Sequence, residues 1–384
     1  MNPLYEQMSV SVFARMSALA AQHGAINLGQ GFPDFGWPDE ILDCAARALK
    51  EGSNQYAPSQ GTPALREAVA AHYGRHHGLD LSADHVCVTS GATEALGAAI
   101  LATVSPGDEV IIFTPAYDSY APMIRRAGGI PREIALQPPE WRIERGAVEA
   151  AIGPNSRAII FNNPHNPAGR LFHPDELEII AGVARAHDLV VISDEVWEHI
   201  TLDDQRFTPL ASLPGMVERT LKIGSAGKIF SLTGWKVGWM VAAPELSAVA
   251  ARAHQFLTFS TAPNLQAAVA YGLDEGDAWI DPMRARFARA RDRMADGLRK
   301  AGFVVLDSAS TYFQCIDLKA SGIGLDDEAF ARLAVEQAGV AVVPLSPFAE
   351  QDPPRHMVRI CFAKKDETID AGVAALRKAK ELAA

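Results

Sequence analysis

The sequence predicts an α/β protein with a large domain, whose mostly parallel sheet is covered by helices, and a smaller α/β domain. Two observations carry this prediction. Apolar runs typical of buried strands alternate with helical patterns over residues 86–242, as in parallel sheets with helices on both faces. After Ala243 the alternation gives way to long helical patterns followed by short strands, which indicates a second unit.

The individual elements follow from hydrophobic periodicity. Residues 10–22 repeat apolar positions at helical spacing, and the Gly- and Pro-rich stretch 28–35 must be a specific loop. The strands expected in the large sheet are 86–89, 109–113, 132–136, 158–161, 189–193, 221–224 and 237–242, with helices such as 174–187 between most of them. In the rest of the chain we expect helices over 244–271, 277–301, 326–338 and 366–382, and strands over 303–306, 312–318, 340–344 and 357–362.

The domain division follows from this order of elements. We expect residues 42–275 to form the large domain, and residues 1–41 and 276–384 to form the small one together. The N-terminal segment is assigned to the small domain because the loop at 29–38 must reach back to the sheet.

Composition and charge exclude several classes of protein. The chain has 384 residues and a net charge of -11, which argues against nucleic acid as the main partner. No run is long and apolar enough to span a bilayer, and the N-terminus has no signal-peptide pattern. The four cysteines are far apart and lack metal-ligand spacing, so we expect no metal site, free thiols and a cytoplasmic location.

One lysine stands out because it lies among small residues directly after an expected strand. Lys228 follows the run 221–224 within Ser225-Ala226-Gly227-Lys228, where a ligand has room beside it. A lysine in such surroundings can form a Schiff base with a carbonyl group. The alternative for this segment alone is a solvated loop lysine.

Four further polar features are of the kinds that a bound anion or cofactor requires. Asp194 ends a four-residue apolar run, and Asn166 lies in a turn made by two Asn-Pro pairs. Residues 90–93 follow a strand and open a helix, which suits a phosphate, and Arg359 inside a strand-like run suits a carboxylate. Taken singly, these features could equally be a helix cap, a turn, an N-cap and a structural ion pair. Ligands of parallel sheets bind beyond the strand ends, where most of these residues are expected.

This ordered set of motifs resembles the class I, fold-type-I aminotransferases that depend on pyridoxal phosphate (PLP). It is most similar to the group of kynurenine–oxoglutarate (glutamine) transaminases and bacterial methionine and succinyl-diaminopimelate aminotransferases. The resemblance runs from Ile26-Asn27-Leu28-Gly29-Gln30-Gly31-Phe32-Pro33-Asp34 to Val358-Arg359-Ile360-Cys361-Phe362, nearly the whole chain. It implies the PLP-dependent transferase fold type I and a homodimer with shared active sites.

The resemblance also implies a role for each site residue. Lys228 would form the Schiff base with PLP and carry a proton, Asp194 would hold the protonated pyridine nitrogen, and Asn166 would donate to the phenolic oxygen. The other cofactor contacts that it implies are Gly91, Ala92, Thr93, Tyr117, Ser225, Lys236 and, from the neighbouring subunit, Tyr56.

Two positions differ from the pattern common in the family. Trp197 stands where most relatives have a tyrosine that bonds the phenolic oxygen, and an indole N–H can donate but cannot ionise. We expect Trp197 to be a neighbour of the cofactor, with its hydrogen bond left open. Lys236 stands where arginine is common, so it would supply a point charge in place of a fork.

Substrate recognition is implied only in outline. Arg359 and Gly31, with Asn166, would bind the substrate's α-carboxylate, and the side-chain pocket would include Phe32, Trp37, Phe259 and Phe348. Such a pocket favours apolar, aromatic, methionine or glutamine-like amino acids, whose amino group would pass to a 2-oxo acid by a ping-pong route. Arg125, Arg126 and Arg252 are conceivable contacts for a distal carboxylate and have no assigned place.

Two other functions remain open on the residues alone. A PLP-dependent β-lyase would use the same Lys228 and Asp194, and would release pyruvate and ammonia without an acceptor. A non-catalytic PLP or amino-acid sensor would need an attached DNA-binding module, and no basic domain precedes residue 26.

Overall fold

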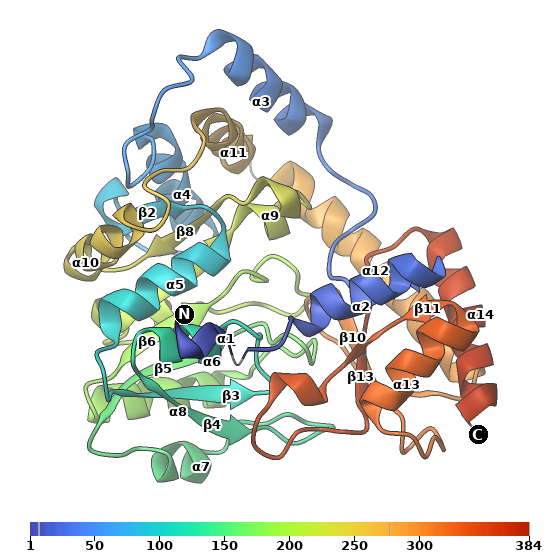
Figure 1. The fold of residues 1–384 in the computed structure, drawn as a ribbon. Coiled ribbons are helices and arrows are strands. Elements are labelled where there is room, and N and C mark those ends of the chain that lie inside the picture. Colours follow the sequence, from blue (N-terminus) through green and yellow to red (C-terminus); the bar gives the residue numbers. More distant parts are fainter. Residues whose placement is uncertain (7, 276, 384) are drawn as a thin grey trace.

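A mostly parallel sheet forms the centre of the computed structural model, which describes residues 1–6, 8–275 and 277–383 (Figure 1). In the described part this sheet has seven strands in the order β2-β8-β7-β6-β5-β3-β4. β8 pairs antiparallel with both of its neighbours, and the other adjacent pairs are parallel, which confirms the predicted fold class. The strands are β2 (Val86–Thr89), β3 (Glu109–Thr114), β4 (Ile130–Ala135), β5 (Ser156–Asn162), β6 (Val190–Asp194), β7 (Thr220–Ser225) and β8 (Gly238–Val241).

Because most of these strands run in the same direction, their carboxyl ends lie together at one edge of the sheet. The carboxyl ends of β2, β3, β5, β6 and β7 lie there together with the amino end of the reversed β8. The register places Asn162 beside Asp194, and Gly238 beside both Thr89 and Ser225. Residues predicted as separate strand-end signals are therefore neighbours in space.

Helices cover this sheet, as expected for strands rich in Val and Ile that are buried along their length. Local signals set the helix ends: Thr62 caps the start of α4, Pro63 takes its first position, and Gly78 follows its end with φ 64°. The helices of this part are α3 (Asp39–Glu51), α4 (Pro63–His77), α5 (Ala92–Thr103), α6 (Tyr120–Arg126), α7 (Arg145–Ala150), α8 (Pro174–Ala186), α9 (Ala226–Ile229), α10 (Pro244–Gln255) and α11 (Pro263–Glu275). Short 3-10 turns are η1 (Ala83–His85), η2 (Leu210–Ser212), η3 (Val217–Arg219) and η4 (Thr233–Trp235).

The C-terminal part forms a second group of elements with the N-terminal segment. An antiparallel sheet has the order β12-β13-β10-β9, and β1 pairs in parallel with β11. Figure 1 shows the blue helix α2 beside the red and orange C-terminal elements, where it contacts β11. The elements are α1 (Pro3–Glu6), α2 (Val12–His23), β1 (Ile26–Asn27), α12 (Asp277–Lys300), β9 (Val304–Val305), β10 (Phe313–Asp317), α13 (Asp327–Leu333), η5 (Ala334–Ala338), β11 (Val340–Ala341), β12 (Val343–Pro344), η6 (Ser346–Phe348), β13 (Met357–Cys361) and α14 (Asp366–Ala383).

The predicted division into domains stays a prediction. Its first boundary, between residues 41 and 42, falls inside α3. Its second boundary is at residue 276, which lies outside the described residues, as do residues 7 and 384 of the small domain.

Three predicted elements need correction. The single helix expected over 244–271 is wrong, because the chain leaves α10 after Gln255 and starts α11 at Pro263. Between them Phe259 has φ 67°, a left-handed conformation that no α-helix contains. The strand expected over 340–344 is two strands in different sheets, and the helix over 326–338 ends in the π-helical turn η5.

The described residues contain no helix with both the length and the apolar character that a membrane crossing requires.

Candidate active site

A cavity of about 380 Å³ lies at the edge where the strand ends gather. The loops after five strands of this sheet and the loop after β1 contribute to its wall, together with the residues that precede β8. The predicted site residues that line it are Gly31, Phe32, Gly91, Ala92, Thr93, Tyr117, Asn166, Asp194, Trp197, Ser225, Lys228 and Lys236. Most of the predicted site is thus brought to one place.

One wall of this cavity is suited to a phosphate. The amino end of α5 faces it, and the first N–H groups of a helix have no partner within the helix. Gly91 has φ 84°, and a Cβ at this position would lie 3.1 Å from Nζ and from Cε of Lys236, so the ammonium lies directly over the start of α5. A Cβ on Gly238 would come within 2.7 Å of the Ala92 nitrogen, so β8 also approaches closely. Ser225 lies beside Gly238 and adds a hydroxyl.

A second wall carries a buried carboxylate. Asp194 is the last residue of β6, and its Oδ2 accepts a hydrogen bond of 2.5 Å from Tyr120 Oη. Burial raises the pKa of Asp194, while the bond from Tyr120 and the charge of Lys228 act in the opposite direction. A carboxylate that is costly to ionise alone fits a ligand that brings a positive charge to it.

The turn after β5 presents an oriented amide. Oδ1 of Asn162 accepts from the backbone N–H of Asn166 at 2.8 Å, and Nδ2 of Asn162 donates to the Asp194 carbonyl at 2.9 Å. Oδ1 of Asn166 in turn accepts from Arg359. Because its oxygen is engaged there, the NH₂ group of Asn166 is free to donate to a ligand in the cavity.

Arg359 is a buried cation that is held by neutral groups. It is 1% exposed on β13, and it donates through Nη1 to Asn166 Oδ1 at 2.7 Å and through Nη2 to the Gly29 carbonyl at 3.0 Å. Its Nε has no hydrogen-bond partner in the described part of the chain. Burial lowers the pKa of Arg359 to about 10. A buried guanidinium with a free donor suits a carboxylate ligand.

Lys228 lies on the short helix α9 directly after β7, with its side chain half-buried. Its Nζ donates to Tyr312 Oη at 3.0 Å and lies 4.5 Å from the centroid of the Trp197 ring. Burial lowers the pKa of Lys228 to about 8, so a minor but appreciable share of the amine is neutral near physiological pH. This is the protonation state that a nucleophile or a proton acceptor needs.

Two aromatic rings complete the wall. Tyr117 follows β3, and its hydroxyl lies 3.4 Å from Thr93 Oγ1 at the start of α5. Trp197 is 3% exposed and packs edge-to-face against Tyr312 at 4.5 Å and against Phe313 at 5.4 Å. Tyr117 can stack on a flat ligand from this position, and Trp197 lies beside Lys228 as a neighbour of the ligand space.

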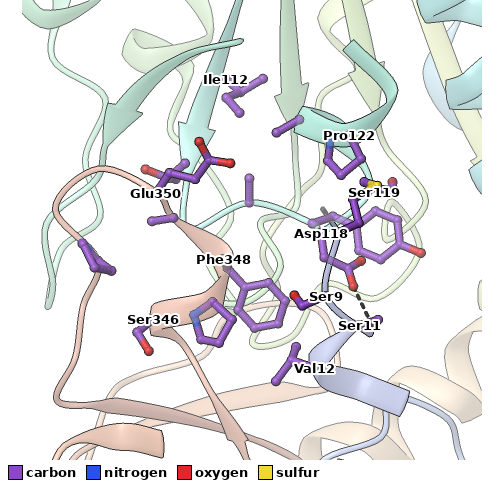
Figure 2. A pocket seen from close by; sticks show the side chains of 18 of the residues that line it. Ser9, Ser11, Val12, Ile112, Asp118, Ser119, Pro122, Ser346, Phe348 and Glu350 are labelled. Atoms are coloured by element: carbon purple, nitrogen blue, oxygen red, sulfur yellow. Dashed lines mark hydrogen bonds between the residues drawn. The ribbon is translucent and has the colours of Figure 1, made fainter. Parts of the chain in front are cut away.

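Five predicted site residues do not line this cavity: Arg359, Tyr56, Trp37, Phe259 and Phe348. Arg359 is joined to the cavity wall through its hydrogen bond to Asn166. Tyr56 is 85% exposed and packs edge-to-face with Phe259 at 5.5 Å, and Trp37 is also exposed. Phe348 lines a second and larger cavity of about 890 Å³ between α6, the N-terminal segment and the loop after η6, where Figure 2 shows its ring near Val12. Tyr117 lines both cavities. The conceivable contacts Arg125 and Arg126 line that larger cavity too.

Several residues of the site were not predicted. Tyr120 and Tyr312 contact Asp194 and Lys228, and Asn162 fixes the turn that carries Asn166. An available signal for Asn162 was its place at the end of an apolar run, like that of Asp194. Tyr312 precedes β10 inside a run that reads as core, so its hydroxyl gave no separate signal.

The structure, over the residues it describes, has no group of three or more His, Cys, Asp or Glu side chains arranged to hold a metal ion. The cavity combines the amine of Lys228, the carboxylate of Asp194 and the amide of Asn166 around one ligand space. It also contains a phosphate cradle, by which we mean Gly91, Ala92, Thr93, Ser225 and Lys236.

Comparisons with known proteins agree with this geometry. The family model of aminotransferase class I and II matches residues 23–376. A probable N-succinyldiaminopimelate aminotransferase of Mycobacterium tuberculosis is 43% identical over 378 residues, covering 95% of each chain. The methionine aminotransferase of Escherichia coli is 40% identical, covering 98% of this chain and 99% of its own.

Solved structures show the same similarity in three dimensions. The N-succinyldiaminopimelate aminotransferase of Mycobacterium tuberculosis superposes with a TM-score of 0.95, covering 98% of this chain and 99% of its own. A double mutant of aspartate aminotransferase from Thermus thermophilus superposes with a TM-score of 0.92 at 30% identity, covering 99% of both chains.

Proposed function

The chain belongs to the class I and II aminotransferase family and is a PLP-dependent aminotransferase, and from this premise we propose its donors, its mechanism and its assembly. The proposed reaction moves an α-amino group from an apolar, aromatic, methionine or glutamine-like amino acid to a 2-oxo acid by a ping-pong route. The observation that carries it is the meeting of Lys228, Asp194 and the phosphate cradle at one cavity of about 380 Å³.

The residues present fit PLP. Bound PLP supplies an aldehyde that can be attached covalently and a ring that withdraws electrons from the substrate's Cα. In this proposal Lys228 provides the covalent attachment, Asp194 pairs with the protonated ring nitrogen, and Asn166 donates to the phenolic oxygen. Gly91, Ala92, Thr93, Ser225 and Lys236 would hold the phosphate, Tyr117 would stack on the ring and Trp197 would be a neighbour of the cofactor; all of these residues line the cavity.

The charges of the site favour these roles. Burial raises the pKa of Asp194, so its carboxylate gains most from a cationic partner, which a protonated ring nitrogen provides. Lys228 has a pKa lowered to about 8 by burial, so its released amine can accept a proton from Cα near neutral pH. One lysine thereby serves in attachment and in proton transfer.

Arg359 is the proposed partner of the substrate's α-carboxylate. Its buried guanidinium has a free Nε and lies against Asn166, which is also a proposed carboxylate contact. Gly31 lines the cavity and adds a backbone contact on the loop that Arg359 reaches through Gly29. These contacts fix the orientation of any amino acid, whatever its side chain.

The proposed donor range rests on the apolar character of the side chains predicted for the substrate pocket. Of these, Phe32 lines the cavity, whereas Phe259 and Trp37 are exposed and Phe348 faces the larger cavity. An apolar pocket separates substrates by only about 1–3 kcal/mol per methylene, so we expect several donors. The relatives differ among themselves in the same way, since their names state N-succinyldiaminopimelate, methionine and kynurenine.

A homodimer with shared sites is part of the proposal. Tyr56 and Phe259 form an exposed aromatic pair, which a second copy of the chain could cover. In that arrangement Tyr56 of one copy reaches the phosphate of the other, and Phe259 closes the other's side-chain pocket. Sedimentation of the purified protein would test it, because a monomer with full activity would contradict shared sites. A cytoplasmic location is also proposed, consistent with four free cysteines.

A screen of amino donors against 2-oxo acids tests the function. We expect methionine, leucine, phenylalanine and glutamine to give more than one equivalent of the corresponding 2-oxo acid per site only when an acceptor is supplied. Activity confined to aspartate would contradict the apolar pocket. Release of pyruvate and ammonia from a cysteine conjugate without an acceptor would identify the β-lyase instead.

A further inference from the structure

We infer that Tyr312 is a positioning residue for Lys228, and that its hydroxyl and the ring of Trp197 form a docking place for the free lysine amine. The inference rests on the proposed function, because it concerns the state in which the amino-acid substrate has taken the covalent place of the lysine.

The hydrogen bonds around Tyr312 have a defined direction. Tyr312 Oη lies 2.5 Å from the Gly31 carbonyl oxygen and 3.0 Å from Nζ of Lys228. A carbonyl can only accept, so the phenol proton points to Gly31 and the phenol oxygen accepts from Lys228. A neutral amine that donates one N–H in this way keeps its lone pair free, and that lone pair is what accepts a proton.

The Tyr312 hydroxyl is held in place by its surroundings. The residue is 1% exposed, and its ring packs edge-to-face against Trp197 at 4.5 Å, Phe313 at 4.9 Å and Phe287 at 5.9 Å. Its carbonyl accepts from the Phe362 N–H at 3.0 Å, next to the strand that carries Arg359. Burial raises the pKa of Tyr312 well above its usual value, so the hydroxyl keeps its proton.

Trp197 supplies the other half of the docking place. Nζ of Lys228 lies 4.5 Å from the centroid of the Trp197 ring and 5.4 Å from that of Tyr312. A ring at this distance attracts an ammonium group. The amine is therefore stabilised in its charged form as well as in its neutral form, and it stays within the cavity in both.

Tyr312 also connects the lysine to the loop that is proposed to bind the substrate. Its proton holds the Gly31 carbonyl, while Gly31 lines the cavity and Arg359 holds the neighbouring Gly29 carbonyl. A Cβ on Gly31 would come within 2.5 Å of the Phe313 ring, so the loop lies directly on this aromatic group. The amine and the carboxylate-binding loop thus share one rigid support.

Tyr312→Phe tests the inference, because it removes one oxygen and keeps the ring. The protein is loaded with pyridoxamine phosphate, which leaves the Lys228 amine free, and is acylated with a trace of acetic anhydride at a series of pH values. Mass spectrometry of the Lys228 peptide gives the pH midpoint of its reactivity. The lost oxygen stabilised the ammonium, so we expect the midpoint to fall by about half a pH unit or more. Tyr73→Phe, another buried tyrosine that loses hydrogen bonds, should leave the midpoint unchanged.

A second readout separates positioning from a structural role. In single turnovers at saturating amino acid, Tyr312→Phe should slow the first half-reaction about tenfold or more, with a Cα-deuterium isotope effect on the slowed step. A residue that only supports the fold would lower thermal stability and cofactor content and leave the rate per loaded site unchanged.

The inference stands only if both the labelling midpoint and the half-reaction change, and it is overturned if either matches the wild type. If Tyr312→Phe does not fold, Trp197→Phe tests the same docking place, since a weaker ring must also lower the midpoint. If the wild type transfers no amino group, the proposed function fails, while the labelling comparison still decides whether Tyr312 docks the amine.

Discussion

Arg359 Nη1 donates to Asn166 Oδ1 across 2.7 Å, which joins strand β13 to the turn after β5. The contact spans 193 positions of the sequence and fixes both side chains at once. It leaves the NH₂ group of Asn166, a residue of the cavity wall, available as a donor, and it anchors the guanidinium to that wall.

Arg359→Lys should weaken amino-acid binding while the protein stays folded. Lysine keeps the charge but loses the fork that reaches Asn166 and a carboxylate together. A hydrogen bond to a charged group contributes about 1.5–3 kcal/mol, so kcat/KM should fall roughly 10- to 100-fold. Steady-state kinetics with methionine measure this. Arg293→Lys, an exposed pair with Asp370, is the matched control, and equal kcat/KM in both variants would reject the role of Arg359.

Gly91→Ala should weaken cofactor binding. The new methyl group would lie 3.1 Å from Lys236 Nζ, and alanine would have to adopt φ 84°. That backbone strain costs on the order of 1–3 kcal/mol, and displacement of Lys236 removes charge from the phosphate cradle. We expect the dissociation constant for PLP, measured by fluorescence titration, to rise about tenfold or more.

Gly182→Ala is the control for this change. Gly182 lies in α8 with only an ordinary contact to Arg145 at 3.8 Å, so the substitution should leave cofactor affinity unchanged. Equal affinity in the two variants would show that Lys236 and α5 do not form the phosphate site.

Covalent attachment of PLP should depend on pH through Lys228. Only the neutral amine attacks an aldehyde, and burial lowers the pKa of Lys228 to about 8. The rate of attachment to the cofactor-free protein should therefore fall roughly tenfold per pH unit below 8 and level off above it. Stopped-flow absorbance measures the rate, and a midpoint near the ordinary lysine value would contradict the burial of this amine.

Lys222→Met should destabilise the large sheet. Lys222 is fully buried in β7 and contacts Glu195 at 2.6 Å and Glu198 at 2.7 Å. Burial alone would lower the pKa of Lys222, but these two carboxylates raise it above its usual value. Removing the cation leaves two buried carboxylates unpaired, which costs about 3–5 kcal/mol of unfolding free energy. Urea unfolding measures this, and the exposed Lys300→Met is the control; equal midpoints would show that the buried pair adds nothing.

Much of this site could be predicted from the sequence because its residues stand at strand ends. The apolar runs before Asp194 and Lys228 predict the strands β6 and β7, and a parallel sheet places the carboxyl ends of its strands together. Gly91 and Lys236 are 145 positions apart, yet the antiparallel β8 brings them into contact. Each of the two residues was predicted from the short motif around it.

Other features could not be predicted, because tertiary contacts decide them. The break between Gln255 and Pro263 occurs in a segment whose helical pattern continues on both sides, and Phe259 within it adopts a left-handed backbone. Tyr120 and Tyr312 have the sequence context of core aromatics, and their hydroxyl partners come from distant strands and loops. Phe348 was placed by its aromatic character alone, and the fold directs it to the larger cavity (Figure 2).

Reduction of the PLP-loaded protein with borohydride, followed by peptide mass spectrometry, tests the central claim most directly. The account predicts a phosphopyridoxyl group on Lys228, and loss of that label when methionine is added before the reductant. A label on another lysine, or a Lys228 label that methionine does not displace, would contradict it.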